Sequence, residues 1–470
     1  MLYQNHAVVI GGSIAGLLAG RILAKHFRHI TIIERDFFPL QPAPRPGLPQ
    51  SRFLHVLLKR GQIILEELFP GLTQELITAG APLLQSSDLA LHLATGKAAP
   101  YANGLNSLSL SRDLLDWVIR QRLSQFQTVQ YLQGSTVTRL LPNADHTGVA
   151  GVVVRRHDPA KPDHIYEEEI PADFVVDASG KASQAPQWLR HLGYKPPAET
   201  VVNAHVWYAH HLFQPPAQTQ TDWRAILIQA TPPTQTQMGI LFPIEGNRWM
   251  VGLGGGAHDR PPTSLTEYLN FAQRLPTPEL YNALKHATPL GDLHHYHGTE
   301  NRWRAYEHIN PYPENFIVMG HAACAFNPVY AQGMTTAALE AQVLDHQFTQ
   351  FAKRQIPKKQ AQHIQQQLAR VQAVPWKMAI TQDYRYPQVQ VSQPMPTVQL
   401  LDWYQEQIWQ LLPQSPYVHR AMMEVIHMLK PPRAMFSPPI LWLVLSNWMQ
   451  QQIFCSKKQN SKRMQSKPSS

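Results

Sequence analysis

The sequence predicts an α/β fold with a Rossmann-type nucleotide-binding domain, an inserted β-sheet domain and a helical C-terminal region. Three observations support this. A short apolar strand, a glycine-rich turn and a helical segment open the chain over residues 6–24. Two further segments, 171–183 and 315–340, read as strands that run into glycine turns. Between them lie four runs rich in aromatic and β-branched residues, which predict strands over Val201–Phe213, Arg224–Ala230, Met238–Ile244 and Trp249–Leu253.

The chain has 470 residues, enough for a large core and two structural regions, and its 44% apolar composition is globular. The predicted nucleotide-binding domain is discontinuous, formed by 1–82, 111–185 and 312–350. The predicted β-sheet domain comprises 83–110 and 186–311. A helical region over 351–455 and a disordered basic tail over 456–470 complete the expected organisation.

Charge and cysteine content bear on the protein's binding partners and on the compartment in which it is found. The formal net charge is +9, and five basic residues lie in the last fifteen positions: Lys457, Lys458, Lys462, Arg463 and Lys467. This tail has no aromatic residue, so we do not expect a nucleic-acid partner. Cys324 and Cys455 are the two cysteines, and the first residues do not read as a signal peptide. We therefore expect a cytoplasmic protein.

The N-terminal segment carries a complete dinucleotide fingerprint. The strand His6–Ile10 meets the turn Gly11-Gly12-Ser13-Ile14-Ala15-Gly16, a helical run follows, and a second strand, His29–Ile33, ends on Glu34. Gly11 permits a tight turn, and Gly16 lets the helix pack close to the strand. The helix N-terminus offers free N–H groups to phosphates, and Glu34 can accept hydrogen bonds from ribose hydroxyls. The expected contact positions are Gly11, Gly12, Ser13, Ala15, Gly16, Glu34 and Arg35.

Two later segments point to a flavin nucleotide. The first is a strand that ends on Asp177, followed by Gly180. In the second, Gly320 and His321 follow a strand, Asn327-Pro328 forms a turn, and a helix begins near Gly333 and Met334.

With the fingerprint, these segments resemble the para-hydroxybenzoate-hydroxylase-like FAD-dependent monooxygenases, in particular their squalene epoxidase and polyether epoxidase branch. The resemblance covers nearly the whole chain. It includes four more segments: Arg45–Arg52 with His55, Ser111–Trp117, Pro243–Trp249 and Asn301–Glu307.

The resemblance implies an FAD cofactor that hydroxylates or epoxidises a lipophilic substrate through a flavin C4a-hydroperoxide. It places Asp177 and Gly180 by the cofactor and Arg112 near its phosphates or ribityl chain. The helix N-terminus after Gly333, presented by Pro328, would stabilise anionic reduced flavin. Arg45, as a positive charge at the flavin edge, and His55 are the candidate catalytic residues, with loop hydrogen bonding as the alternative role for both.

One position departs from the family pattern. The family normally has Asp directly after Gly320, where it bonds a ribityl hydroxyl, and this chain has His321. An imidazole can donate or accept a hydrogen bond there but cannot supply a carboxylate. A degenerate, non-catalytic FAD-fold protein is therefore one alternative.

A second alternative is a flavin-dependent reductase of a polyprenyl-type substrate, which would use the same fold. Flavin halogenases share this fold too, but they carry a Trp-x-Trp motif that this chain lacks.

A second glycine-rich segment, Gly252–Gly256, is followed by no helix, so we interpret it as a strand end. Without a second Rossmann unit, NAD(P)H would bind transiently as reductant, or another reductant would be used. The histidines at 205–211 and 294–297 lack acidic or thiol partners at metal spacing, and we predict no metal site.

The C-terminus allows two interpretations. Pro439–Leu445 is strongly apolar, Gln450–Gln452 interrupt the pattern, and the basic tail follows. Such a segment can pack on the protein's own core as a final helix. It can also make peripheral contact with an anionic membrane.

Overall fold

The computed structural model describes residues 4–101, 105–158, 161–217, 221–353, 359–393 and 399–465. Its centre is a five-stranded parallel sheet in the order β19-β11-β1-β2-β7. The strands are β1 (Gln4–Ile10), β2 (Phe27–Ile33), β7 (Val129–Leu132), β11 (Phe174–Asp177) and β19 (Phe316–Val318). The central residues of β1, β11 and β19 are apolar, often β-branched, and buried, as strands covered on both faces require, whereas the edge strand β7 exposes Gln130. The predicted α/β fold class with a parallel sheet is confirmed.

Helices lie around this sheet, some packed on it and others on those helices or on the neighbouring strand β8 (Ser135–Pro142). They are α1 (Ile14–Leu23), α2 (Lys59–Leu68), α3 (Leu72–Thr78), α4 (Arg112–Leu123), α5 (Ala185–His191) and α8 (Gly333–Lys353). Helix α1 packs against both α4 and α8. A three-stranded antiparallel sheet, β8 (Ser135–Pro142), β9 (Val149–Asp158) and β10 (Lys161–Pro171), lies between β7 and β11 in the chain.

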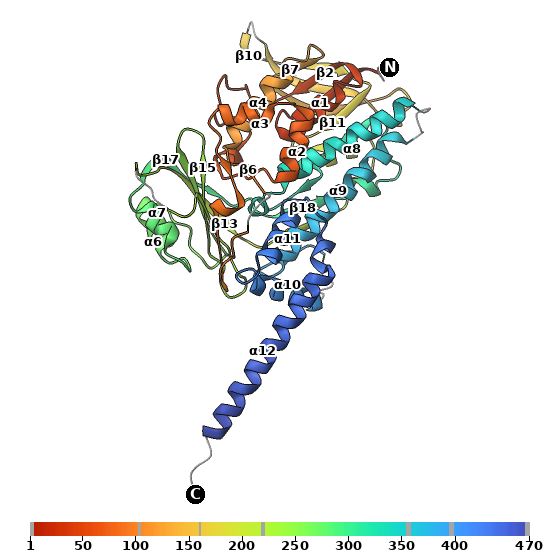
Figure 1. Cartoon of the computed structure of the whole chain (residues 1–470). Coiled ribbons are helices and arrows are strands. Elements are labelled where there is room, and N and C mark those ends of the chain that lie inside the picture. The colour runs from red at the N-terminus through yellow and green to blue at the C-terminus, as the bar shows by residue number, and fades with distance from the viewer. Residues whose placement is uncertain are drawn as a thin grey trace.

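A separate seven-stranded sheet has the order β17-β13-β16-β15-β14-β4-β5. Its strands are β4 (Leu89–Leu93), β5 (Gly96–Lys97), β13 (Trp207–Gln214), β14 (Ala225–Ile228), β15 (Met238–Ile244), β16 (Arg248–Gly255) and β17 (Thr288–Tyr296). Helices α6 (Leu265–Gln273) and α7 (Glu279–Leu284) flank the sheet on its outer side (Figure 1). Trp207, Phe213 and Phe271 are among the aromatic residues in the core between them.

The sequence located most of these strands, with one difference. β15 has the expected bounds, and Gly252–Gly255 ends β16 as expected. The single strand expected over Val201–Phe213 is two strands, β12 (Glu199–Asn203) and β13, in different sheets. The chain turns between them at His205, whose φ is +52°. β12 pairs with β18 (Asn301–Arg304) and β21 (Gln390–Val391). β20 (Cys324–Ala325) completes this four-stranded sheet, and β3 (Leu83–Leu84) pairs with β6 (Ser107–Leu108).

The C-terminal region is mainly helical. It contains α9 (Gln360–Asp383), which packs on α8, then α10 (Gln399–Leu411), α11 (Pro416–Ile426) and α12 (Pro438–Gln465). Helix α12 projects away from the body (Figure 1). It includes residues 456–465, for which we expected disorder, and the rest of that tail lies outside the described residues. In the described residues, no helix combines the length and apolarity needed to cross a membrane.

Candidate active site

A cleft of about 410 Å³ opens where β1, β2 and β11 end. Thirteen residues singled out from the sequence line it: Gly11, Ser13, Ala15, Glu34, Arg35, Arg45, His55, Arg112, Gly180, His321, Pro328, Gly333 and Met334. Gly12, Gly16, Asp177 and Gly320 lie in the turns behind this surface and do not line it. The carboxyl ends of parallel strands are the usual ligand edge of such a sheet.

The glycine turn leaves no room for side chains. Gly11 has φ +101°, and a Cβ on it would lie 2.6 Å from the carbonyl oxygen of Ala178. A Cβ on Gly16 would overlap the carbonyl oxygen of Gly11. Helix α1 can therefore start directly against β1, and its first N–H groups, which have no intrahelical partner, face the cleft.

Glu34 organises one end of the cleft. Its carboxylate accepts hydrogen bonds from the backbone N–H of Gly12 at 2.8 Å and of Asp36 at 3.1 Å. Arg45 forms an ion pair with it at 2.9 Å. Arg45 also donates to the carbonyl oxygen of Gly12 and lies 3.3 Å from Asp116. Burial opposes the charge of Arg45, but Asp116 and Glu34 raise its pKa above the ordinary value.

From the sequence we expected Arg45 at the flavin edge. The structure pairs it with the carboxylates of Glu34 and Asp116 and with the carbonyl oxygen of Gly12. Arg45 therefore stabilises the glycine turn, and its catalytic role stays a prediction.

Arg112 is a cation of the cleft lining that forms no ion pair among the described residues. It begins α4, and its Nη2 donates to the Ser13 hydroxyl at 2.8 Å. Its Nε is buried and has no hydrogen-bond partner among the described residues. Burial lowers the pKa of Arg112, although Asp116 opposes this shift. A phosphate at Ser13 would supply the missing acceptor.

His321 lies at the opposite side of the turn, against the start of α8. Its ring packs on Gly333, where a Cβ would come within 2.5 Å of Nε2. That Nε2 is buried without a partner in the described part of the chain. Burial, Arg112 and Lys181 lower the pKa of His321 to about 4. The imidazole is therefore neutral at physiological pH.

Asp177 shapes the turn that carries Gly180. Its carboxylate accepts hydrogen bonds from the Ser183 hydroxyl at 2.5 Å and from the Ser179 backbone at 2.9 Å. Asp177 is fully buried, and burial raises its pKa. The side chain thus holds the turn in place, and Gly180 and Lys181 form the cleft wall.

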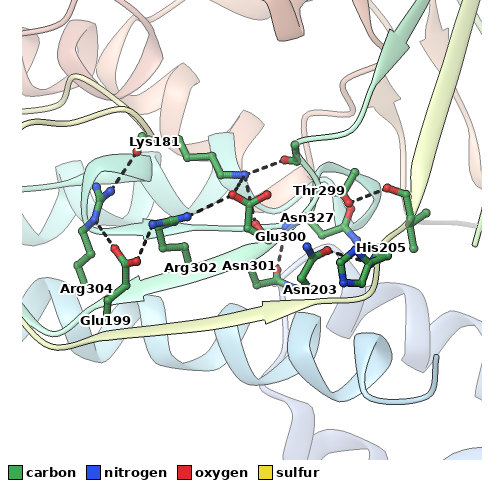
Figure 2. Close-up of polar contacts among 12 residues, drawn as sticks. Lys181, Glu199, Asn203, His205, Thr299, Glu300, Asn301, Arg302, Arg304 and Asn327 are labelled. Atoms are coloured by element: carbon green, nitrogen blue, oxygen red, sulfur yellow. Dashed lines mark hydrogen bonds and ion pairs between the residues drawn. The ribbon is translucent and has the colours of Figure 1, made fainter. Parts of the chain in front are cut away.

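Lys181 belongs to a chain of ion pairs between β12 and β18 (Figure 2). Its ammonium lies 2.8 Å from Glu300 and donates to the carbonyl oxygen of Gly298. Arg302 joins Glu300 to Glu199, and Arg304 joins Glu199 to the carbonyl oxygens of Lys181 and Ala322. This network ties both cofactor turns, at 177–183 and 320–322, to one sheet.

A second cavity, of about 210 Å³, adjoins the cleft and is mainly apolar. The seven-stranded sheet, the 50–58 loop and α11 enclose it. Its lining includes Phe53, Leu105, Leu227, Ile240, Phe242 and Met423. Six residues line both cavities: Gln50, His55, Val56, Tyr296, Pro328 and Ala331. The two spaces therefore meet between the 50–56 loop and the turn before α8.

His55 stands at this junction. Its Nδ1 lies 2.9 Å from the carbonyl oxygen of Phe53, so Nδ1 carries the proton and Nε2 keeps a lone pair. Burial, Arg112 and His321 lower the pKa of His55 to about 3. His210 lines the apolar cavity and accepts a hydrogen bond from the backbone of Leu54 at 3.2 Å.

A buried polar cluster, which the sequence did not reveal, lies beside the apolar cavity. Asp383, on α9, is fully buried and accepts hydrogen bonds from Tyr330 and Asn301. Tyr208 donates to Asn327 at 2.7 Å, and Asn327 lies next to Asp383. Burial raises the pKa of Asp383 to about 7. No local motif marks Asp383, whereas Asp116 follows Arg112 by one helical turn and could have been paired with it.

The cleft has the properties that FAD needs. Its lining contains four cations, Arg35, Arg45, Arg112 and Lys181, and one acid, Glu34, among the described residues. The unpartnered nitrogens of Arg112 and His321 belong to residues that line this space, where the N-termini of α1 and α8 also lie. In the described residues, no group of three or more His, Cys, Asp or Glu side chains is arranged to hold a metal ion.

Several solved structures similar to this chain are flavin-dependent proteins. A flavoprotein/dehydrogenase from Cytophaga hutchinsonii has a TM-score of 0.65 at 15% identity, covering 95% of this chain and 100% of the other. p-Nitrophenol 4-monooxygenase PnpA from Pseudomonas putida gives 0.64 at 16%, covering 92% and 100%. The myxobacterial chondrochloren halogenase CndH gives 0.61 at 16%, covering 92% and 97%. The chain therefore has the fold of FAD-dependent monooxygenases and halogenases.

Sequence similarity identifies a narrower group. No protein-family model matches the chain. Protein Rv3254 of Mycobacterium tuberculosis (strain ATCC 25618 / H37Rv) is 33% identical over 343 residues, 72% of each chain. The chain belongs to the same family as Protein Rv3254.

Proposed function

We propose that this protein is an FAD-dependent monooxygenase that hydroxylates or epoxidises a lipophilic substrate, in the manner of the squalene epoxidase-like branch. The observation that carries the proposal is the pairing of two spaces. A cation-lined nucleotide cleft adjoins an apolar cavity, and six residues form the wall of both. Bound FAD, once reduced, supplies the activation of dioxygen that such a reaction requires.

The chain's own residues would bind, orient and exclude water. Arg112 and the N-terminus of α1 would hold the diphosphate, and Glu34 the adenosine ribose. The N-terminus of α8 would place positive potential beside the flavin ring. The apolar lining of the second cavity would seat the substrate and keep water out.

His55 is the side chain best placed to touch substrate. It borders both spaces, and the lone pair of its Nε2 can accept a hydrogen bond. Because its pKa is about 3, it stays neutral across the physiological range and can act as an acceptor throughout.

We propose NAD(P)H as a transient reductant, since Gly252–Gly256 lies at the end of a strand and offers no second dinucleotide site. Halogenases are among the enzymes that share this fold. We do not propose halogenation, because no two tryptophans of this chain are spaced two residues apart.

The decisive experiment begins with flavin. The purified protein, reconstituted with FAD, is supplied with NAD(P)H, labelled dioxygen and a panel of lipophilic alkenes and phenols. Substrate-dependent incorporation of one labelled oxygen atom is expected. Reduction of the substrate without oxygen would replace the proposal with a polyprenyl-type reductase, and failure to bind FAD would indicate a non-catalytic FAD-fold protein.

A substitution in the apolar cavity tests the role of that cavity independently of FAD binding. Ile240→Trp adds bulk to the apolar cavity without touching the FAD cleft, because Ile240 lines only the former. We expect unchanged FAD binding and loss of substrate oxidation. Asp222→Asn, at an exposed position, is the matched control.

A further inference from the structure

Helix α12 carries an apolar stripe that the rest of the protein covers only in part, Trp448 being in ring contact with Trp403. Five large apolar side chains on it are exposed: Leu441, Trp442, Leu445, Trp448 and Met449. Trp442 has 67% of its surface exposed. Exposed apolar residues gathered in this way mark an interaction surface.

These five positions share one face. Their spacings of one, three, four, seven and eight residues place them within an arc of roughly 120° on an α-helix. The neighbouring face is buried, with Ile440 and Val444 packed among Leu411, Leu412 and Val418. The start of α12 is thus fixed on the body, and its stripe is held outward.

The positive charge of the residues that follow the α12 stripe indicates which kind of partner would bind it. No acidic residue follows Glu424, whereas Lys457, Lys458, Lys462, Arg463 and Lys467 follow the stripe. A second copy packed in parallel would bring the same cations against each other, and one packed antiparallel would leave them without an anionic partner. An anionic bilayer complements them, and tryptophans such as Trp442 and Trp448 favour the bilayer interface.

We propose that the α12 stripe and the basic segment after it dock the protein on the surface of an anionic membrane. Gln450–Gln452 interrupt the apolar run, so the helix would lie in the interface with its stripe among the headgroups. The proposal does not depend on the proposed enzymatic activity, and its test needs neither flavin nor substrate.

The test is vesicle flotation of the full chain, with phosphatidylcholine vesicles and with vesicles that also contain phosphatidylglycerol. We expect binding to the anionic vesicles that weakens in high salt. The triple variant Trp442→Gln, Leu445→Gln, Met449→Gln should bind at least roughly tenfold less. Replacing the basic residues 457, 458, 462 and 463 by Gln should have a similar effect.

The matched control is Leu40→Gln, because the side chain of Leu40 is 91% exposed and distant from α12 in sequence. It should bind as the unmodified chain does. Unfolding midpoints of all variants check that Ile440 and Val444 still anchor the helix. Three results would overturn the proposal. They are absence of binding, equal salt-insensitive binding to neutral vesicles, and a solution dimer that the triple variant dissociates while no form floats.

Discussion

The Tyr330 hydroxyl donates a hydrogen bond to the buried carboxyl group of Asp383 at 2.5 Å, joining the turn before α8 to helix α9. Tyr330 also lines the apolar cavity. The pair therefore couples the wall of the proposed substrate space to a group that titrates near neutral pH.

We predict a pH-dependent loss of stability from Asp383. Its folded-state pKa is raised to about 7, above the value near 4 of an exposed carboxyl. The folded state therefore favours the protonated form, and stability falls as pH rises from about 4 to about 7, by on the order of 2–4 kcal/mol. Asp383→Asn should flatten this part of the curve, measured by denaturant unfolding at pH 5 and pH 8. Parallel curves for the variant and the unmodified chain would exclude this assignment.

Arg112→Met should weaken FAD binding by about 1.5–3 kcal/mol, the scale of hydrogen bonds to charged groups. The reason is that Arg112 faces the phosphate position with an unpartnered nitrogen, whereas Arg45 and Lys181 are already paired. Fluorescence titration of FAD measures the change. Arg139→Met, at an exposed strand position, is the control. Equal affinity of both variants would remove Arg112 from the site.

His321→Asp should strengthen FAD binding by about 1–2 kcal/mol, since a carboxylate can accept a charge-assisted hydrogen bond from a ribityl hydroxyl. Arg112 and Lys181, which already lower the pKa of His321, would favour the anion. His321→Asn has the same shape without the charge and should give little gain. Weaker binding by the Asp variant would mean that the imidazole is itself adapted to the cofactor.

Gly11→Val and Gly16→Val should each abolish FAD uptake. A side chain at Gly11 would collide with the Ala178 carbonyl, and one at Gly16 with the Gly11 carbonyl. Flavin content after reconstitution is the measurement, with circular dichroism as the check on folding. A folded variant that keeps its full flavin content would refute this account of the turn.

The sequence was most informative where local chemistry repeats a known pattern. The glycine turn and Glu34 lie at strand and helix ends that the periodicity marks, whereas Arg112 was implied by the family resemblance. The ion pairs of Arg45 with Glu34 and Asp116 were not foreseen, because Asp116 is distant in sequence. Asp383 was not found at all. Its neighbours Asn301, Asn327 and Tyr330 come from separate parts of the chain, and only the fold brings them together.

The split at His205 had a similar cause. A continuous run of strand-forming residues suits one long strand as well as two, and propensity does not encode a left-handed backbone position at a histidine. For helix α12, the sequence had already allowed for both a buried and an exposed apolar face. The sequence left two interpretations open, and the structure supports core packing for Ile440 and Val444 while leaving Trp442 outside.

The strand order also has a consequence for biosynthesis. The parallel sheet begins with β1 and is completed by β19, at Phe316–Val318, and β4 finds its partner β14 only after more than a hundred further residues have been made. The five-stranded and the seven-stranded sheets therefore both stay incomplete until the later strands have been translated. Such long-range pairings close slowly and leave unpaired strand edges exposed in the meantime. A nascent chain halted before β19 would be a natural client for chaperones, and shortened chains ending there should aggregate.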